Sequence, residues 1–220
     1  GDTQPHASLY TALHSLSEAL GVDPWPHLQR LAERCVQYVG ISKRKEVFWA
    51  PSDVVAATAA ALLQHTSLDA AGVIALLARR QRCLLGSSTA GAAAVLQQLQ
   101  SELGLAPQQL TNMVRAAPGL LELTPGALAQ QLGYLCGEGA LGLTTQQAAA
   151  VVAANPRVLV VPAATWSASV AFLVGLGLGG DVVRSLVMAA PGLATAPLKD
   201  LILRWNYLRA ELKVGRGWAQ

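Results

Sequence analysis

The chain has 220 residues, of which 52% are hydrophobic and 13% charged, so it can bury a large core and is too apolar to be intrinsically disordered. Its formal net charge of +3 permits contact with nucleic acid without requiring it. The three cysteines, Cys35, Cys83 and Cys136, lie far apart and indicate buried thiols rather than a disulfide framework or a zinc site.

Residues 1–66 are predicted to form a degenerate N-terminal repeat or docking region. The chain begins with Gly1 rather than methionine, which we interpret as a processed, trimmed or partial product without a targeting peptide. Pro51 precedes Pro125 by 74 residues, and "APSDVVAATAAALL" resembles "TPGALAQQLGYL", so an older repeat unit is expected here. The segment "GISKRKEVF" is interpreted as a basic insertion.

Residues 67–212 are predicted to consist of repeats with a period of about 35 residues. Leu-Gly-Leu occurs at 103–105, 141–143 and 176–178, and a proline follows each glycine after fourteen residues, at Pro118, Pro156 and Pro191. A second proline follows six or seven residues later, at Pro125, Pro162 and Pro197. An earlier unit has Arg82 and Ser88 at the two proline positions. This period is typical of stacked helix hairpins.

Each unit is predicted to be a pair of antiparallel helices. In the first unit with all landmarks, the first helix spans Gln108–Ala116, carries apolar residues at helical spacing and ends before Pro118. The apolar residues are Leu110, Met113, Val114 and Ala117. A link, "GLLEL", buries two leucines, and Pro125 occupies the first position of a second helix that ends near Cys136. Glycine-rich tails then end the unit.

Residues 158–180 contain no charged side chain, and a run of this length could cross a bilayer. Pro162 and four glycines interrupt it, and the repeat register divides it into two pieces that are each too short, so we predict no membrane span. The cluster Val158–Val161 is interpreted as a buried connector rather than a strand. Residues 213–220 are predicted to be a C-terminal tail.

No pattern in the sequence predicts catalysis. The four histidines form no metal-ligand pair, and neither a nucleophile elbow nor a Walker loop is present. Gly137, Gly139 and Gly142 lack the strand and the spacing of a dinucleotide-binding loop and are interpreted as helix terminators. We therefore predict a protein that is not an enzyme and has no cofactor, metal or small-molecule substrate.

The segment "LTNMVRAAPGLLELTPGALAQQLGYLCGEGALGLTTQQAAAVVAANPRVLVV" and the unit after it resemble the mitochondrial transcription termination factor (mTERF) family. The shared elements are a first helix that ends before a Pro-x-Leu-Leu variant, a second helix that ends in Leu-Gly-Leu, and the period. The resemblance implies an all-α fold, a curved α-solenoid of helix hairpins. It also implies an organellar nucleic-acid-binding role, in the mitochondrial matrix or in a plastid.

Basic residues concentrate in two regions, 43–82 and 199–220, which each carry a local charge of +3. Six bases and three acids lie in the first region, and five bases and two acids in the second. Arg79 and Arg115 share a position three residues before Arg82 and Pro118, but Ala153 and Met188 interrupt this series. The candidate nucleic-acid-binding residues are Lys43, Arg44, Lys45, Arg79, Arg80, Arg82, Arg115, Lys199, Arg204, Arg209, Lys213 and Arg216.

Tryptophans offer a second kind of nucleic-acid contact, because aromatic rings stack on unpaired bases. Trp166 lies among alanines in a predicted second helix and is assigned to the core. Trp218, in the tail "GRGWAQ", has no visible core to join and is the tryptophan that we expect to meet a partner.

The charge pattern predicts an RNA-binding component of a ribonucleoprotein such as the mitochondrial ribosome, which contacts structured rRNA through its basic ends and other ribosomal or organellar proteins elsewhere. From Glu138 through Leu198, with Glu138 included, only four residues are charged, fewer than a protein that clamps a duplex would be expected to carry. Two alternatives stay open. One is a protein-binding scaffold with an apolar groove, and the other is an organellar DNA-binding transcription termination factor.

Overall fold

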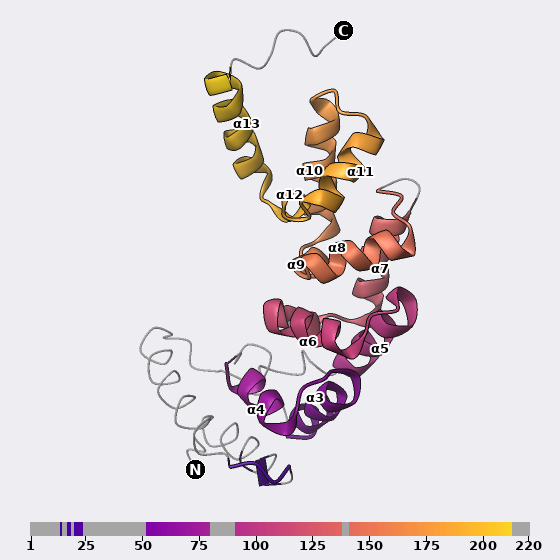
Figure 1. Ribbon diagram of the computed structural model, residues 1–220, viewed down its shortest axis with the longest axis vertical. Helices are drawn as coiled ribbons and strands as arrows, with labels where there is room; N and C mark the ends of the chain where they lie inside the picture. Colours follow the sequence, from indigo (N-terminus) through magenta and orange to yellow (C-terminus); the bar gives the residue numbers. More distant parts are fainter. Residues whose placement is uncertain are drawn as a thin grey trace, which may run out of the picture. The chain divides into compact units, whose positions relative to one another are not determined.

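The computed structural model describes residues 14, 17–18, 20–23, 52–79, 91–137 and 141–212 (Figure 1). Every regular element in these ranges is a helix, and none is a strand, which confirms the all-α prediction. No helix within the described ranges is both long and apolar enough to cross a membrane. The chain forms two compact units, residues 1–125 and 126–220.

From residue 52 onward, the described part of the first unit contains four α-helices and one short 3-10 helix. These are α3 (Ser52–His65), α4 (Ala70–Arg79), α5 (Ala92–Leu103), α6 (Pro107–Ala116) and η2 (Pro118–Glu122). Helix α3 begins directly after Pro51, the proline that the sequence matched to Pro125. Helix α5 begins four residues after Ser88, which is later than the alignment of Ser88 with Pro125 predicts.

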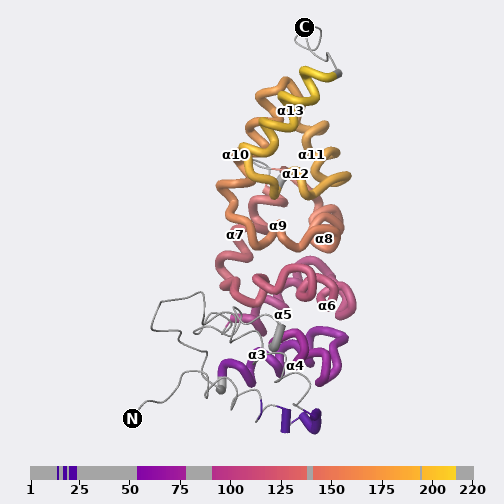
Figure 2. The backbone as a smooth tube through the Cα atoms, turned by 90° about the vertical axis from the view of Figure 1, so that its left-hand side faces the viewer, coloured from indigo at the N-terminus to yellow at the C-terminus, as the bar shows by residue number. Residues whose placement is uncertain are grey.

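The second unit contains two successive sets of a long, a short and a long helix after α7. The elements are α7 (Pro125–Cys136), α8 (Thr145–Ala154), α9 (Arg157–Val160), α10 (Ala163–Gly175), α11 (Gly180–Ala189), α12 (Gly192–Thr195) and α13 (Leu198–Leu212). Helix α8 packs on α11, α9 on α12 and α10 on α13. Figure 2 shows α8 and α11 on one side of this unit, α10 on the other, and α9 and α12 between them. Such stacking of like elements is the arrangement of a helical-repeat solenoid, as predicted.

In three repeats, the first proline produces the same turn. The residues before it, Ala117, Asn155 and Ala190, have φ/ψ of −136°/75°, −142°/86° and −141°/75°. The proline ring disfavours helical geometry in the preceding residue. Each of these three residues still donates its N–H to the carbonyl four positions back, at 2.8 to 2.9 Å, so the first helix closes its last turn before the chain bends.

The links between the paired helices contain a short helix that the sequence did not predict. Pro156 and Pro191 have helical φ/ψ of −62°/−19° and −57°/−21° and are the N-caps of α9 and α12. The predicted connector Val158–Val161 is thus largely helical, with Val158 and Leu159 buried and Val160 exposed. In the first unit the link η2 buries Leu120 and Leu121, which confirms the two buried leucines.

The second proline of each repeat lies at the start of the second helix, although Pro162 and Pro197 directly precede the helix instead of occupying its first position. Helix α7 begins at Pro125 itself. Helix α10 begins at Ala163, with Pro162 as its N-cap at φ −57° and ψ 142°, and α13 begins after Pro197. Because the N-cap residue lies half outside the helix, an extended ψ there is compatible with the fixed φ of proline.

The Leu-Gly-Leu glycines share a left-handed backbone. Gly104, Gly142 and Gly177 have φ of +63°, +58° and +86°, a region that only glycine adopts at no steric cost. Gly104 ends α5 and donates its N–H to Gln100 O at 3.0 Å. Gly177 closes the turn after α10, whereas Gly142 lies six residues beyond the end of α7 and leads into α8. Of the predicted helix terminators, Gly137 is confirmed, because it directly follows α7 and donates its N–H to Gly133 O at 2.8 Å. Gly142 does not end α7, and Gly139 lies outside the described residues.

The described first helices all bury the fourth and eighth positions after the residue that precedes the helix, and α4, α6 and α8 also bury the seventh. The buried residues are Val73, Leu76 and Leu77 in α4, Leu110, Met113 and Val114 in α6, Ala148, Val151 and Val152 in α8, and Val183 and Val187 in α11. This spacing places them on one face. One prediction of a buried side chain is wrong, because Cys136 is exposed at the end of α7.

Candidate nucleic-acid interface

Helix α13 carries the described part of the C-terminal basic series. The side chains of Lys199, Arg204 and Arg209 are all exposed, and successive residues of a helix are separated by about 100°, so the three lie on different sides of α13. Asp200 and Glu211 on the same helix are also exposed. Helix α13 contains three basic and two acidic residues, so its net charge is only +1.

Buried contacts on one side of α13 fix which of its faces is free. Leu201 is buried and the helix packs on α10. Just before α13, Ser169 Oγ of α10 donates to Ala196 O at 3.2 Å. These contacts hold one side of α13 and leave the opposite side, with Lys199 and Leu203, exposed.

Arg115 is exposed in the last turn of α6, and Arg79 is the last residue of α4. The predicted shared register of this pair does not hold when the core positions are aligned. Counted from the buried Val73 and Leu110, Arg79 is six residues on and Arg115 is five, so their positions differ by about 100° around the helix.

The other seven candidate residues lie outside the described residues, as does Trp218. They are Lys43, Arg44, Lys45, Arg80, Arg82, Lys213 and Arg216. The side chain of Arg79 also lies outside the described part, although its backbone belongs to α4. The structure therefore places four candidate side chains, those of Arg115, Lys199, Arg204 and Arg209.

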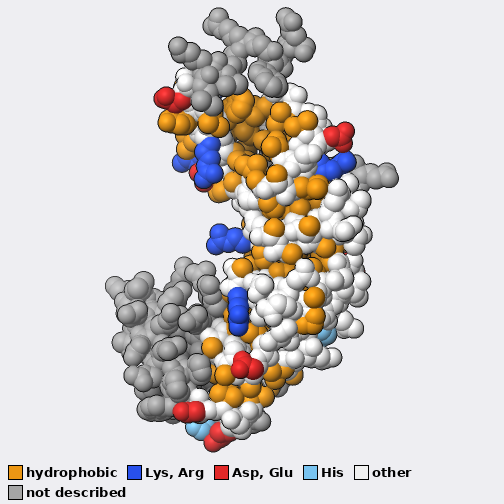
Figure 3. Space-filling view, in the orientation of Figure 1, with side chains coloured by type: hydrophobic (Ala, Val, Ile, Leu, Met, Phe, Trp, Pro, Cys, Tyr) orange, Lys and Arg blue, Asp and Glu red, His pale blue; other side chains and the backbone are white. Residues whose placement is uncertain are grey.

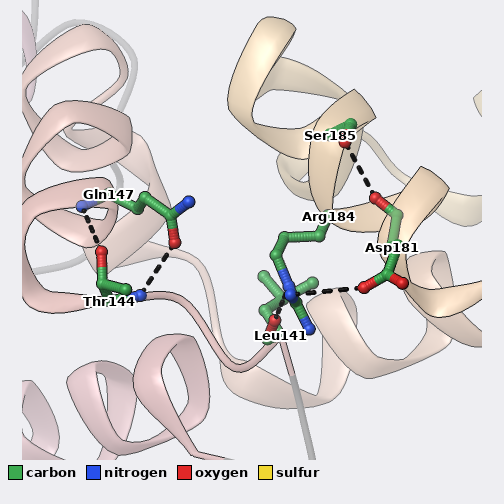
Figure 4. A network of polar contacts seen from close by, with 6 residues as sticks. All are labelled: Leu141, Thr144, Gln147, Asp181, Arg184 and Ser185. Carbon is green, nitrogen blue, oxygen red and sulfur yellow. Dashed lines mark hydrogen bonds and ion pairs between the residues drawn. The ribbon is translucent and has the colours of Figure 1, made fainter.

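Arg184, in the charge-poor region, is used inside the protein. Its Nε donates to Leu141 O at 2.9 Å, and its Nη1 lies 3.4 Å from Asp181 Oδ1. Figure 4 shows the arginine reaching from α11 to the turn before α8. At the start of α8, Thr144 and Gln147 form a reciprocal capping box, with the Thr144 N–H donating to Gln147 Oε1 and the Gln147 N–H to Thr144 Oγ1.

The equivalent position two repeats earlier has a similar role. Thr111 lies one residue after the buried Leu110, as Arg184 lies one residue after Val183. Thr111 Oγ1 accepts a hydrogen bond from Ser67 N at 2.9 Å, in the turn that precedes α4. At this register, therefore, a polar side chain ties α6 and α11 each to the turn of the preceding repeat.

Few charges are left on the surface of residues 141–198. Arg184 and Asp181 pair with each other, and Arg157, at the start of α9, is exposed. Within the described part of this region, Arg157 is the cation without an ion-pair partner.

Two aromatic residues that could contact bases differ in accessibility. Trp166 is buried, as predicted. Its Nε1 donates to Val158 O at 3.1 Å, and its ring packs edge-on against Tyr134, with 6.2 Å between centroids. Burial raises the pKa of the Tyr134 phenol above its usual value, so it is uncharged at neutral pH. Tyr207, which sequence analysis did not single out, is 66% exposed on α13.

The spacing of exposed residues on α13 could have revealed Tyr207. Leu203 and Tyr207 are four residues apart, and neither falls on the side of the helix that carries the buried Leu201. Among the described residues there is no group of three or more His, Cys, Asp or Glu side chains that could hold a metal ion.

The stacked long–short–long helices, with a repeated pre-proline turn and a left-handed glycine, define a helical-repeat protein. The mTERF family model matches residues 58–215, which is most of the chain, so the chain belongs to the mTERF family. Members of this family are organellar helical-repeat proteins that bind nucleic acid and are generally not enzymes. A comparison with curated protein sequences gives no match.

Proposed function

We propose that this chain is a non-catalytic RNA-binding component of an organellar ribonucleoprotein, such as the mitochondrial ribosome, which it enters as a structural protein in the mitochondrial matrix. The observation that supports the proposal is the distribution of charge. The basic residues of the sequence concentrate in regions 43–82 and 199–220, and the repeats from 141 to 198 offer Arg157 as their unpaired cation among the described residues.

A protein that grips a nucleic-acid duplex typically neutralises about six to ten phosphates. Arg184 is not free for this purpose, because contact with a phosphate would require it to leave Leu141 and Asp181. A few contacts at each end are instead sufficient to position a folded RNA without reading its bases. The same twelve basic residues that the sequence singled out form the proposed site.

The described part of this site can be tested in vitro. Replacing Arg204 and Arg209 together by glutamine should weaken binding of a structured RNA and reduce the slope of log affinity against log salt by about two. The variant Arg157→Gln is the matched control, because it removes one exposed charge outside the two basic regions, and its slope should change by no more than about one. Tight binding of a specific DNA duplex at physiological salt would instead favour a transcription termination factor.

The ribonucleoprotein can be tested in the cell. Crosslinking in a native organellar extract should attach the chain to one ribosomal RNA through residues 43–82 or 199–218, in particles of ribosomal size, and nuclease should release it. Localisation to plastids rather than mitochondria would correct the compartment alone. Free protein with no RNA attached would overturn the proposal.

A protein-binding scaffold is the second candidate, and exposed apolar side chains in the charge-poor region favour it. Val174 of α10 and Val182 and Met188 of α11 are each more than 40% exposed. Under this alternative, a protein partner would stay bound after nuclease treatment, and replacing Val182 and Met188 by serine would release it without changing RNA affinity.

A further inference from the structure

Helix α13 exposes four side chains at a regular spacing of four residues. They are Lys199, Leu203, Tyr207 and Glu211, and we call them the α13 stripe. Leu203 is 57% exposed and Tyr207 66%, and both charged residues are exposed. Along the helix the stripe therefore runs from a positive charge through two apolar side chains to a negative charge, and hydrophobic, basic and acidic side chains lie together over α13 in Figure 3.

The two charges of the stripe are not compensated within the described part of the chain. Neither Lys199 nor Glu211 has an ion-pair partner there. They cannot pair with each other, because twelve helical residues separate them by about 18 Å. The apolar centre is also uncovered, since Leu203 and Tyr207, with Arg204 and Leu208, line an open cavity of about 420 Å³.

We propose that the α13 stripe is the contact surface for a second copy of this chain, with the two α13 helices packed antiparallel. In the opposite direction, the stripe presents a negative charge, two apolar side chains and a positive charge. Two antiparallel stripes are therefore complementary in charge and in polarity. A two-fold axis midway between Leu203 and Tyr207 places Lys199 opposite Glu211 of the second copy and Leu203 opposite Tyr207. By symmetry, each contact occurs twice.

The geometry of helix packing permits this pairing. The stripe is a ridge of residues spaced four apart, and two such ridges align when the helices cross at about −50°, the commonest class of helix packing. A parallel arrangement would bring Lys199 against Lys199 and Glu211 against Glu211, so the charges select the antiparallel one.

The charges also favour a second copy over RNA as the occupant of this stripe. A phosphate backbone that follows the stripe would meet the carboxylates of Asp200 and Glu211, which repel it. The dimer would take Lys199 from the proposed RNA site, whereas Arg209 lies roughly 160° around the helix from Tyr207 and stays available for RNA. The dimer therefore does not depend on the proposed function. A single helix pair is smaller than the standard interface of about 1,600 Å², so we expect dissociation in the micromolar range.

The test is sedimentation equilibrium of the full chain, freed of nucleic acid, over a range of micromolar concentrations. Lys199→Glu and Glu211→Lys each create two like-charged contacts and should raise the dissociation constant by roughly tenfold or more. The double variant, which swaps the charges, should restore it to that of the unmodified chain. Arg209→Glu makes the same change of charge away from the stripe and should leave the dissociation constant unaltered.

Tyr207→Ser tests the apolar centre separately and should also weaken the dimer. Because all of these side chains are exposed, circular dichroism should show unchanged helix content. A chain that is monomeric throughout, single variants without effect, or a double variant that fails to recover would each overturn the proposal. Glu211→Lys adds positive charge, so it should break the dimer without weakening RNA binding. Failure of the RNA proposal would therefore be seen separately.

Discussion

Replacing Arg184 by alanine should destabilise the second unit by about 1.5 kcal/mol. The substitution removes the hydrogen bond from Nε to Leu141 O, and Leu141 is only 4% exposed, so water replaces the donor poorly. Hydrogen bonds from charged groups contribute about 1.5–3 kcal/mol, and the 39% exposure of the arginine side chain places this one at the lower end. The pair with Asp181, whose side chain is 92% exposed, adds less than about 0.5 kcal/mol.

The assays are urea denaturation and thermal denaturation, each followed by circular dichroism. For a chain of this size, a loss of about 1.5 kcal/mol corresponds to a decrease in melting temperature of roughly 3–6 °C. Arg157→Ala is the matched control, because it removes from the same unit an exposed arginine that has no ion-pair partner among the described residues. In the Arg184→Ala variant, hydrogen exchange should be faster at the Leu143 amide, which donates to Leu135 O close to the bond between Arg184 and Leu141. Equal stability of the Arg184→Ala and Arg157→Ala variants would refute the reasoning.

Two further substitutions test the repeat geometry in the same denaturation assays. Trp166→Phe should cost about 2–3 kcal/mol, because it leaves the buried Val158 carbonyl without its donor and opens a small cavity, and a loss below about 1 kcal/mol would mean that water replaces the indole. Gly177→Ala should cost about 1 kcal/mol because its φ is +86°. Its counterpart Gly133→Ala, in the exposed middle of α7 with open space around it, should gain about 0.5–1 kcal/mol, so effects of equal sign would contradict the backbone argument.

The landmarks that predicted the fold are residues whose backbone restrictions are independent of context. Proline restricts its own φ and the conformation of the residue before it, so helix boundaries could be located from sequence to within about one residue. The predicted first helix Gln108–Ala116 became Pro107–Ala116, and the predicted second helix Pro125–Cys136 was unchanged. The buried residues of the first helices could be predicted equally well, because burial follows the helical period.

The remaining features depend on contacts between segments far apart in sequence. A link of four or five residues contains too few positions to display a helical period, so α9 and α12 could not be distinguished from an extended connector. The register of Arg79 and Arg115 was counted from Arg82 and Pro118 rather than from the core, and the count was one residue out. Arg184 could be recognised as charged, but its use as a tether requires Leu141 to be next to it.

The position of Thr111 and Arg184, one residue after the first buried position of a first helix, links the stability of the fold to where cations are free to bind RNA. Thr111 and Arg184 both bond to the turn of the preceding repeat, and Ala149, at this register in the repeat between them, has no polar side-chain atom. A cation at this register is thus committed to the fold, and moving it to a phosphate would cost the same 1.5 kcal/mol or so that its removal does. Exposed cations at the ends, such as Arg204, carry no such cost. Substitutions at Arg184 should therefore change stability and leave RNA affinity unaltered, whereas those at Arg204 should do the reverse.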